Sequence, residues 1–368
     1  MNQQLYRKLI SGESQCRASK ILRFCLLGAA KGYAAVIAVR NFLYSKGWLK
    51  TYYSTATVIS VGNITTGGTG KTPLVIWLCK YLTDENISCA VLTRGYKSQK
   101  HKLSDEPAIV AKNCPAVKVI VNPNRVAGAE KAVKEFSSEV LIMDDGFQHR
   151  RLGRDLNIVT IDGTVPFGYG KMLPAGMLRE PMRSLERADA VVITRTDQCT
   201  DTELNEIEEK LRCFNSDMII ARSVHKPISA KCIGSEEITL KQLEDKMIFA
   251  FCGIGNPESF FASIREIGSG LVGTKVFNDH YRYKPEEVTD ICEQANYLDA
   301  DVILTTQKDW TKTALLVSQA AKSGSCKETA PDENMPFAYL AIELEFTRGE
   351  EKLRSLIQDT LAGKINKK

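Results

Sequence analysis

The sequence lacks closely spaced cysteines. Its eleven cysteines are scattered along the chain, and no two lie fewer than nine positions apart. This spacing excludes a C-x-x-C metal or redox motif, and the odd count argues against the disulfide framework of a secreted protein. We therefore expect reduced thiols in a cytosolic compartment and no metal cluster.

Acidic residues are scarce at the amino-terminal end. The first 50 residues contain one acid, Glu13, and nine basic groups, namely Arg7, Lys8, Arg17, Lys20, Arg23, Lys31, Arg40, Lys46 and Lys50. This segment has a net charge of +8, and since the whole chain has +5, the other 318 residues have −3. A mildly acidic body is not typical of a nucleic-acid-binding protein. The positive charge at one end instead indicates an anionic surface, such as that of a membrane, as a partner.

A long apolar run free of charges is also lacking. Residues 21–39, ILRFCLLGAAKGYAAVIAV, almost reach the length that crosses a bilayer, which is about 20 apolar residues. Lys31 lies in the middle of this run, and a central lysine costs roughly 2.5–3.5 kcal/mol on insertion. A simple membrane span is therefore disfavoured.

The same segment separates into two faces when it is drawn as a helix. The basic face carries Arg17, Lys20, Arg23 and Lys31, and the opposite face carries Leu22, Cys25, Leu26, Ala29, Tyr33 and Val36. Such a basic amphipathic helix is expected to lie in the headgroup plane of an anionic membrane. The alternative is an ordinary helix packed on the body of the protein.

After residue 55, short β-branched runs alternate with helical stretches. Continuous apolar runs such as VLIM and AVVIT are typical of strands covered on both faces, as in a parallel sheet wrapped by helices. The candidate strands are 58–61, 89–93, 118–121, 140–143, 157–161, 190–194, 218–221, 247–252, 302–305 and 339–344. A polar stretch around 225–237 indicates a boundary. We expect an α/β protein with an N-terminal helical region (1–50), a first lobe (51–230) and a smaller second α/β lobe (231–368).

The run TVISVGNITTGGTGKTPLVIWL contains a phosphate-binding loop, or P-loop. A strand leads through a glycine-rich turn, whose backbone N–H groups can surround anionic oxygens, into a helix whose N-terminus adds partial positive charge. Lys71 is placed to reach the β- and γ-phosphates of a nucleotide. The usual pattern is G-x-x-x-x-G-K-[ST], and Thr65 replaces its first glycine. The predicted nucleotide-binding residues are Thr65, Thr66, Gly67, Gly68, Thr69, Gly70, Lys71 and Thr72.

Two carboxylates follow the apolar run 140–143, namely Asp144 and Asp145. A P-loop protein that uses Mg²⁺ holds the ion with the P-loop hydroxyl and an acid at the end of a neighbouring strand. We therefore predict a magnesium site formed by Thr72, Asp144 and Asp145, in a lobe that resembles P-loop nucleotide hydrolases.

Several motifs, in this order, resemble the tetraacyldisaccharide 4′-kinase family. They are VGNITTGGTGKTP, LTRGY, SDEP, DDGFQHRRLGRDLNIVTID, GKMLPAGMLREP, FCGIGNPESFF, DHYRY and LTTQKD, and the resemblance extends from about residue 15 to about residue 312. The family's activity is ATP-dependent phosphorylation of the 4′-hydroxyl of an acylated glucosamine disaccharide 1-phosphate in lipid A synthesis. The resemblance implies ATP and Mg²⁺ as cofactors, and a peripheral or monotopic place on the cytoplasmic face of the inner membrane.

The resemblance also implies roles for individual residues. Asp105 of the D-E-P motif and His280 of the D-H-Y motif are expected to form a base for the sugar hydroxyl, with Lys71 as the third catalytic residue. Arginine donates two hydrogen bonds to a phosphate, which suits an anionic sugar lipid. The candidate substrate-binding residues are Asn63, Arg94, Tyr96, Arg125, His149, Arg179 and Glu180. For His149 a packing role is equally open.

Two other functions remain open from the sequence. One is a P-loop ATPase or GTPase that acts as a regulator or chaperone at the membrane. The other is a membrane-docked nucleotide-binding scaffold without catalysis, although Lys71, Asp105 and His280 would then be idle.

Overall fold

The computed structural model describes residues 3–95, 105–232, 236–322 and 335–365. The chain forms two compact units, Met1–Val224 with Leu344–Lys368, and His225–Glu343. Strands β7 and β12 each begin in one unit and end in the other. The C-terminal segment therefore belongs to the first unit, whereas the sequence pattern had placed all of 231–368 in the second lobe.

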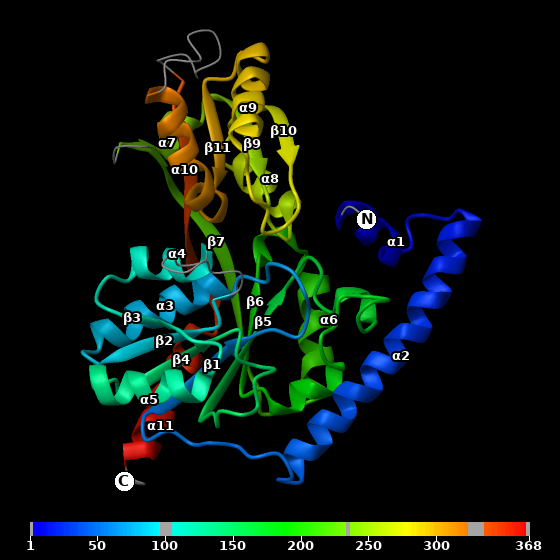
Figure 1. Ribbon diagram of the computed structural model, residues 1–368, viewed down its shortest axis with the longest axis vertical. Helices are drawn as coiled ribbons and strands as arrows, with labels where there is room; N and C mark the ends of the chain where they lie inside the picture. The colour runs from blue at the N-terminus through cyan, green and yellow to red at the C-terminus, as the bar shows by residue number, and fades with distance from the viewer. Residues whose placement is uncertain (1–2, 96–104, 233–235, 323–334, 366–368) are drawn as a thin grey trace. The chain divides into compact units, whose positions relative to one another are not determined.

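The first unit is built on a parallel sheet with the strand order β7-β6-β5-β1-β4-β2-β3 (Figure 1). Its strands are β1 (Thr57–Gly62), β2 (Cys89–Thr93), β3 (Lys118–Val121), β4 (Val140–Asp144), β5 (Leu156–Asp162), β6 (Ala190–Thr194) and β7 (Ile219–Cys232). Its helices are α1 (Gln3–Ser11), α2 (Arg17–Ser45), α3 (Lys71–Asp84), α4 (Asp105–Asn113), α5 (Arg125–Phe136), α6 (Asp201–Arg212) and α11 (Glu350–Ile365). Short 3₁₀ turns occupy Gly168–Gly170, Met182–Arg187 and Thr196–Gln198.

Side chains of β1 alternate between two apolar layers, as a strand covered on both faces requires. Ile59 and Val61 pack with α3, α4 and α11, whereas Val58 packs with α5 on the other face. Strand β1 is central in this sheet, and its Val61 pairs with Asp144 of β4. The carboxyl ends of these two strands therefore meet at one edge of the sheet.

The second unit contains four parallel neighbouring strands in the order β10-β9-β11-β12. Its elements are β8 (Glu237–Thr239), α7 (Leu240–Leu243), β9 (Met247–Cys252), α8 (Pro257–Glu266), β10 (Gly270–Val276), α9 (Pro285–Tyr297), β11 (Val302–Thr306), α10 (Gln307–Lys322) and β12 (Phe337–Arg348). Helix α8 packs on one face of this sheet, and α9 and α10 pack on the other.

Each of the ten candidate strands corresponds to an observed strand, and the α/β fold class is confirmed. Two details differ from the prediction. Strand β10 was not predicted, because its sequence GLVGTKV contains two glycines, which weaken a strand pattern. Strand β7 continues to Cys232 and so includes much of the polar stretch around 225–237, although the two units do divide at the start of that stretch, between Val224 and His225.

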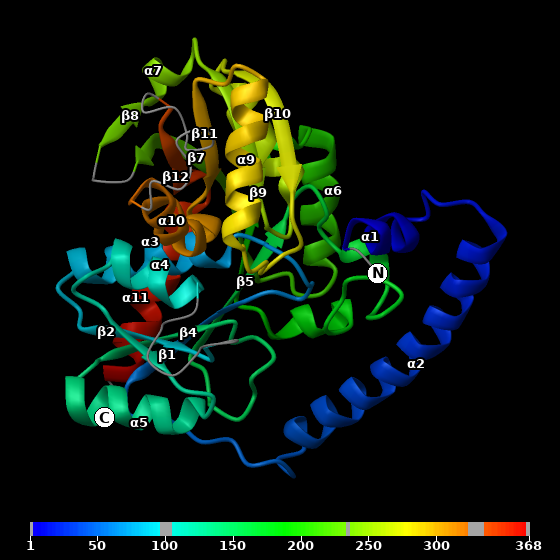
Figure 2. The same cartoon turned by 45° about the horizontal axis from the view of Figure 1, so that its top comes forward.

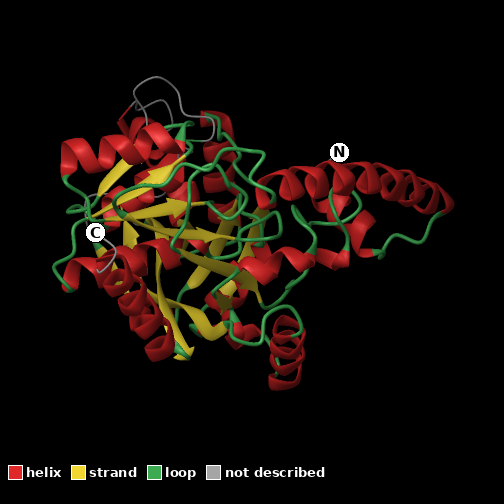
Figure 3. Ribbon diagram, turned by 90° about the horizontal axis from the view of Figure 1, so that it is seen from below, coloured by secondary structure: helices red, strands yellow, loops and turns green. Residues whose placement is uncertain are grey.

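Helix α2 extends away from the strands of the first unit, as Figures 2 and 3 show. Its outward side is apolar: Ile21, Phe24, Val36, Val39 and Phe42 are all more than half exposed. Within the described residues, α2 is the helix whose length and composition would allow it to cross a membrane. Only 11% of its most apolar 18-residue stretch is buried. The N-terminal apolar helix is thus confirmed, although its faces differ in detail from the prediction, because Tyr33 points to the body of the protein.

Candidate active site

The P-loop connects the end of β1 to the start of α3. Two of its glycines, Gly67 and Gly70, have φ angles of +109° and +80°, a left-handed conformation that side chains disfavour. Gly62 permits a close approach, since a Cβ there would lie 2.6 Å from the Cβ of Phe147. The turn that precedes Lys71 therefore depends on glycine at these positions.

Buried side chains hold the loop from beneath. The Asn63 side-chain amide donates to Thr69 Oγ1 at 3.0 Å, and Thr69 Oγ1 lies 2.8 Å from Thr160 Oγ1 of β5. The hydroxyl of Thr194 donates to the Thr69 carbonyl at 3.2 Å. Asn63 was expected to bind substrate, but its side chain is 1% exposed and is used to support the loop.

The first two residues of the predicted nucleotide site have other partners. Thr65 is buried and bridges to Leu178, and the Thr66 N–H donates to the Met177 carbonyl at 2.8 Å. These contacts attach the P-loop to the segment that precedes Arg179. The N–H of Thr66 is therefore not free for a phosphate, and the part of the loop open to a ligand begins at Gly67.

The two acids after β4 differ in their surroundings. Burial, with Glu106 and Asp145 nearby, raises the pKa of the Asp144 carboxyl to about 7. Burial would also raise the pKa of Asp145, but Lys71 and Arg179 outweigh this and lower it to about 2. Glu106 was not predicted as a site residue, although it adjoins Asp105 at the start of α4 and acts electrostatically on Asp144.

Asp145 is the meeting point of two cations. Its Oδ1 accepts a hydrogen bond from Arg179 Nη1 at 2.8 Å and lies 3.5 Å from Lys71 Nζ. Arg179 Nη1 also lies 3.3 Å from Asn63 Oδ1 and 3.3 Å from Gln148 Oε1. The structure thus brings Lys71, Asp145 and Arg179 together from three separate motifs. Asp145 also has a positive φ, 51°, which turns its backbone sharply after the strand.

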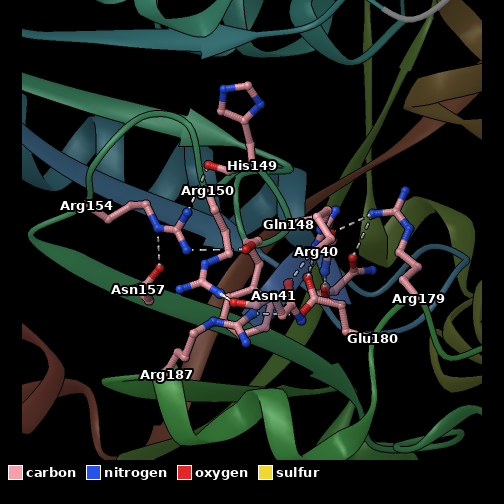
Figure 4. Close-up of polar contacts among 12 residues, drawn as sticks. Arg40, Asn41, Gln148, His149, Arg150, Arg154, Asn157, Arg179, Glu180 and Arg187 are labelled. Carbon is pink, nitrogen blue, oxygen red and sulfur yellow. Dashed lines mark hydrogen bonds and ion pairs between the residues drawn. The ribbon is translucent and has the colours of Figure 1, made fainter. Parts of the chain in front are cut away.

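Glu180, the neighbour of Arg179, faces away from solvent. Its carboxylate is completely buried and accepts hydrogen bonds from Arg40 at 3.0 Å, Arg187 at 2.7 Å and Asn41 at 3.1 Å (Figure 4). Arg40 and Asn41 belong to α2, and the Tyr33 hydroxyl of the same helix donates to the Arg179 carbonyl at 3.0 Å. Glu180 therefore anchors α2, and direct contact with a substrate is not compatible with its burial.

Two further predicted substrate residues have local structural partners. Arg125 is 5% exposed, and its Nη2 donates to the Asp144 carbonyl at 3.0 Å. Burial, followed by the charges of Arg125, Arg154 and Arg151, lowers the pKa of His149 to about 4. In Figure 4 its ring points away from the other side chains drawn, while its backbone carbonyl accepts a hydrogen bond from Arg154. Among the described residues, no hydrogen-bond partner reaches its Nε2. Arg94 is exposed just after β2, and Tyr96 lies outside the described residues.

The proposed base consists of residues from different units. Asp105 is the first residue of α4 in the first unit, and its side chain is partly exposed. His280 belongs to the second unit, has a φ of 59°, and its Nε2 lies 3.2 Å from Lys308 Nζ. Lys308 also forms an ion pair of 3.0 Å with Asp279. The D-H-Y and L-T-T-Q-K-D motifs therefore meet, a contact that the sequence alone did not indicate.

A strand that leads through a glycine-rich loop into a helix, beside a strand that ends in acids, defines a P-loop protein of the α/β class. Comparison with known proteins then identifies the family. A family model described as tetraacyldisaccharide-1-P 4′-kinase matches residues 22–362. The chain belongs to this family and is a phosphotransferase, which confirms the resemblance inferred from the motifs.

The sequences of individual relatives are similar to this chain along most of their length. A tetraacyldisaccharide 4′-kinase of Halothermothrix orenii is 36% identical over 332 residues, or 83% of this chain and 86% of the relative. A tetraacyldisaccharide 4′-kinase of Chlorobaculum parvum is 34% identical over 375 residues, which are 95% of this chain and 98% of the relative. The crystal structure of the "apo" form of LpxK from Aquifex aeolicus in complex with ATP superposes with a TM-score of 0.67 and 30% identity, and covers 92% of this chain and 99% of that chain.

Proposed function

We propose that this protein transfers the γ-phosphate of ATP to the 4′-hydroxyl of an acylated glucosamine disaccharide 1-phosphate in lipid A biosynthesis. The observation that carries the proposal is the convergence of Lys71, Asp145 and Arg179 on the P-loop, in a chain of the tetraacyldisaccharide-1-P 4′-kinase family. Family membership also counts against the alternative of an ATPase or GTPase regulator, because the named relatives are kinases.

The P-loop would hold the triphosphate through the N–H groups that follow Gly67 and through the positive end of α3. Lys71 is paired with Asp145 across 3.5 Å, a distance that leaves its ammonium group able to turn to the β- and γ-phosphates. Arg179 shares the same carboxylate, so it is held beside the site where charge develops during transfer. These residues would bind and orient the nucleotide.

The acids beside the P-loop fit a magnesium ion. The Thr72 hydroxyl and the carboxylates of Asp144 and Asp145 are oxygen donors of the kind that Mg²⁺ prefers. Burial first, and then the negative charges of Glu106 and Asp145, raise the pKa of Asp144, and a bound cation would offset both effects. Within the described residues, no group of three or more His, Cys, Asp or Glu side chains could hold a metal by itself. Mg²⁺ usually keeps waters and phosphate oxygens as its other ligands. When bound, it would neutralise charge on the β- and γ-phosphates.

Asp105 and His280 are the proposed base for the sugar hydroxyl. A carboxylate beside an imidazole fixes its tautomer, and the pair can accept or orient the proton that the hydroxyl loses. In the second unit, Lys308 and Asp279 hold the His280 ring. Among the other candidates, Arg94 and Arg179 remain proposed contacts for the anionic sugar lipid.

The exposed apolar side of α2 supports a peripheral or monotopic place on the cytoplasmic face of the inner membrane. The opposite side of the helix is bound to the body through Tyr33, Arg40 and Asn41. A helix attached along one side and apolar along the other suits the membrane interface, where the lipid substrate lies.

The test is product analysis after incubation of the protein with ATP, Mg²⁺ and tetraacyldisaccharide 1-phosphate. Mass spectrometry should show one added phosphate on the disaccharide, and Lys71→Ala should lower the rate by more than about a hundredfold. Lys80→Ala, on the exposed side of the same helix, is the matched control and should retain the activity. ATP turnover that ignores the lipid would support the ATPase reading instead.

A further inference from the structure

The first helix, α1, packs on the segment that is attached to the P-loop. The Tyr6 hydroxyl donates to the Pro174 carbonyl at 2.8 Å, and Leu9 and Ile10 are buried. Figures 1 and 2 both show α1 next to the green loops of the first unit. Because the Met177 carbonyl of the same segment accepts the Thr66 N–H, α1 is connected to the P-loop through a single intervening loop.

Arg7 extends from α1 directly to the P-loop. Its Nη2 lies 3.5 Å from the position that a Cβ on Gly67 would take. Gly67 is the first residue of the open part of the loop, and Met177 Cε lies 3.4 Å from the same Cβ position. Within the part of the chain that the structure describes, no ion pair is formed by Arg7. A flexible cation without a carboxylate partner thus lies beside a phosphate-binding turn.

We propose that the Arg7 guanidinium contacts the phosphate oxygens of ATP bound in the P-loop, so that α1 contributes a catalytic residue to the site. This inference rests on the proposed function of the P-loop. An arginine fits the geometry better than a lysine, because its planar fork can bridge two phosphate oxygens.

The physical reason for an added cation lies in the reaction. The transferred phosphoryl group carries charge on its equatorial oxygens in the transition state, and an arginine supplied within the same chain stabilises that charge. Lys71 and Arg179 share the charge of Asp145, so part of their field is already offset. The positive charge of Arg7 is not offset by a carboxylate in this way. Since α1 leads into α2, the residue that contacts ATP and the helix that meets the membrane lie in one N-terminal segment.

The experiment compares Arg7→Ala, Arg7→Lys and Lys8→Ala in the full-length protein in neutral detergent. Arg7→Ala and Lys8→Ala each remove one positive charge from α1, but Lys8 is exposed. Two quantities are measured: the rate of phosphate transfer to the disaccharide, and the equilibrium affinity for ATP without lipid. We expect Arg7→Ala to lower kcat by about tenfold or more and to weaken ATP binding. Arg7→Lys should recover part of the loss, and Lys8→Ala should remain within about twofold of the wild type.

Two outcomes would overturn the inference. If Arg7→Ala behaves like Lys8→Ala in both measurements, Arg7 does not contact the nucleotide. If Arg7→Ala binds ATP more tightly, the guanidinium obstructs the loop and does not assist it. The Lys71→Ala variant distinguishes a failure of this inference from a failure of the proposed function. If Lys71→Ala is inactive and Arg7→Ala behaves like the wild type, only the role of Arg7 is refuted. If Lys71→Ala is fully active, the proposed function of the P-loop is refuted.

Discussion

Glu180 shows how a single buried charge fixes the position of its neighbours. Its carboxylate has no exposed surface and is shared by Arg40, Arg187 and Asn41. Burial alone would raise the pKa of Glu180, but the charges of Arg187 and Arg40 outweigh it and bring the pKa below its ordinary value. Because Arg179 is the next residue, the same anchor holds the side chain that bonds to Asp145.

We expect Glu180→Ala to lower the free energy of unfolding by about 1–3 kcal/mol, since it removes the buried acceptor that the half-buried Arg40 and Arg187 share. Chemical denaturation measures the change. Glu186→Ala is the control, because its ion pair with Arg183 is exposed and should contribute less than about 1 kcal/mol. An unchanged free energy of unfolding in Glu180→Ala would show that Glu180 is not the anchor of α2.

His149 predicts a dependence of stability on acid. Its pKa is about 4 in the folded protein and about 6.5 in the unfolded chain, so between these values the unfolded state binds the extra proton. Stability should therefore fall as the pH is lowered from about 6.5 to about 4. Because the imidazole is only partly buried, solvent screening limits its share to the order of 1 kcal/mol.

The variant His149→Gln tests this dependence. Its free energy of unfolding should differ from that of the wild type by a fixed amount at pH 8, where both side chains are neutral. The difference should shift in favour of the variant as the pH falls toward 4, because glutamine takes up no proton. If the free energies of unfolding of the two proteins change with pH in parallel over this range, His149 is not the source of the acid dependence.

At the scale of elements, the sequence predicted features that depend on a short local pattern better than contacts between distant positions. Lys71 and Asp144 were found from sequence because each depends on a short unit, a strand with its following turn. Their proximity then follows from the parallel pairing of Val61 with Asp144. The burial of Glu180 was not predictable in the same way, because its partner Arg40 lies 140 positions away. The structural contact of Asn63 was not predictable for a related reason: nothing in the motif indicates that its amide supports Thr69.

Helix α2 shows the same limit. The helical repeat identified the element, but the choice of apolar face depended on where the body of the protein lies. Tyr33, which the repeat assigned to the lipid side, bonds to the Arg179 carbonyl. Phe24, which is in neither of the two predicted faces, is 78% exposed.

The exposed face of α2 should therefore decide membrane binding. We expect the double variant Phe24→Ser and Val39→Ser to bind anionic phospholipid vesicles about tenfold or more weakly, because each apolar side chain contributes roughly 1.5–3 kcal/mol when it leaves water. Co-sedimentation with vesicles measures this. Leu315→Ser is a control, since Leu315 is 57% exposed but lies in α10 of the second unit. Equal binding by all three proteins would mean that α2 is not the contact.

At the scale of the whole molecule, the proposed base divides its residues between two units that the chain connects twice, through β7 and β12. Asp105 begins a helix in one unit, and His280 follows a strand in the other, beside Lys308. If the two act as one catalytic group, removing either should remove the function of both.

We expect Asp105→Ala and His280→Ala each to lower kcat by about 10²–10⁴, the usual range for a general base, while ATP affinity is retained because the P-loop is intact. The double variant should be no slower than the slower single variant. Single-turnover measurements with bound ATP isolate the chemical step, and unfolding curves of the three variants check that each is folded. Losses that multiply would show that Asp105 and His280 act independently, since a shared role can be lost only once.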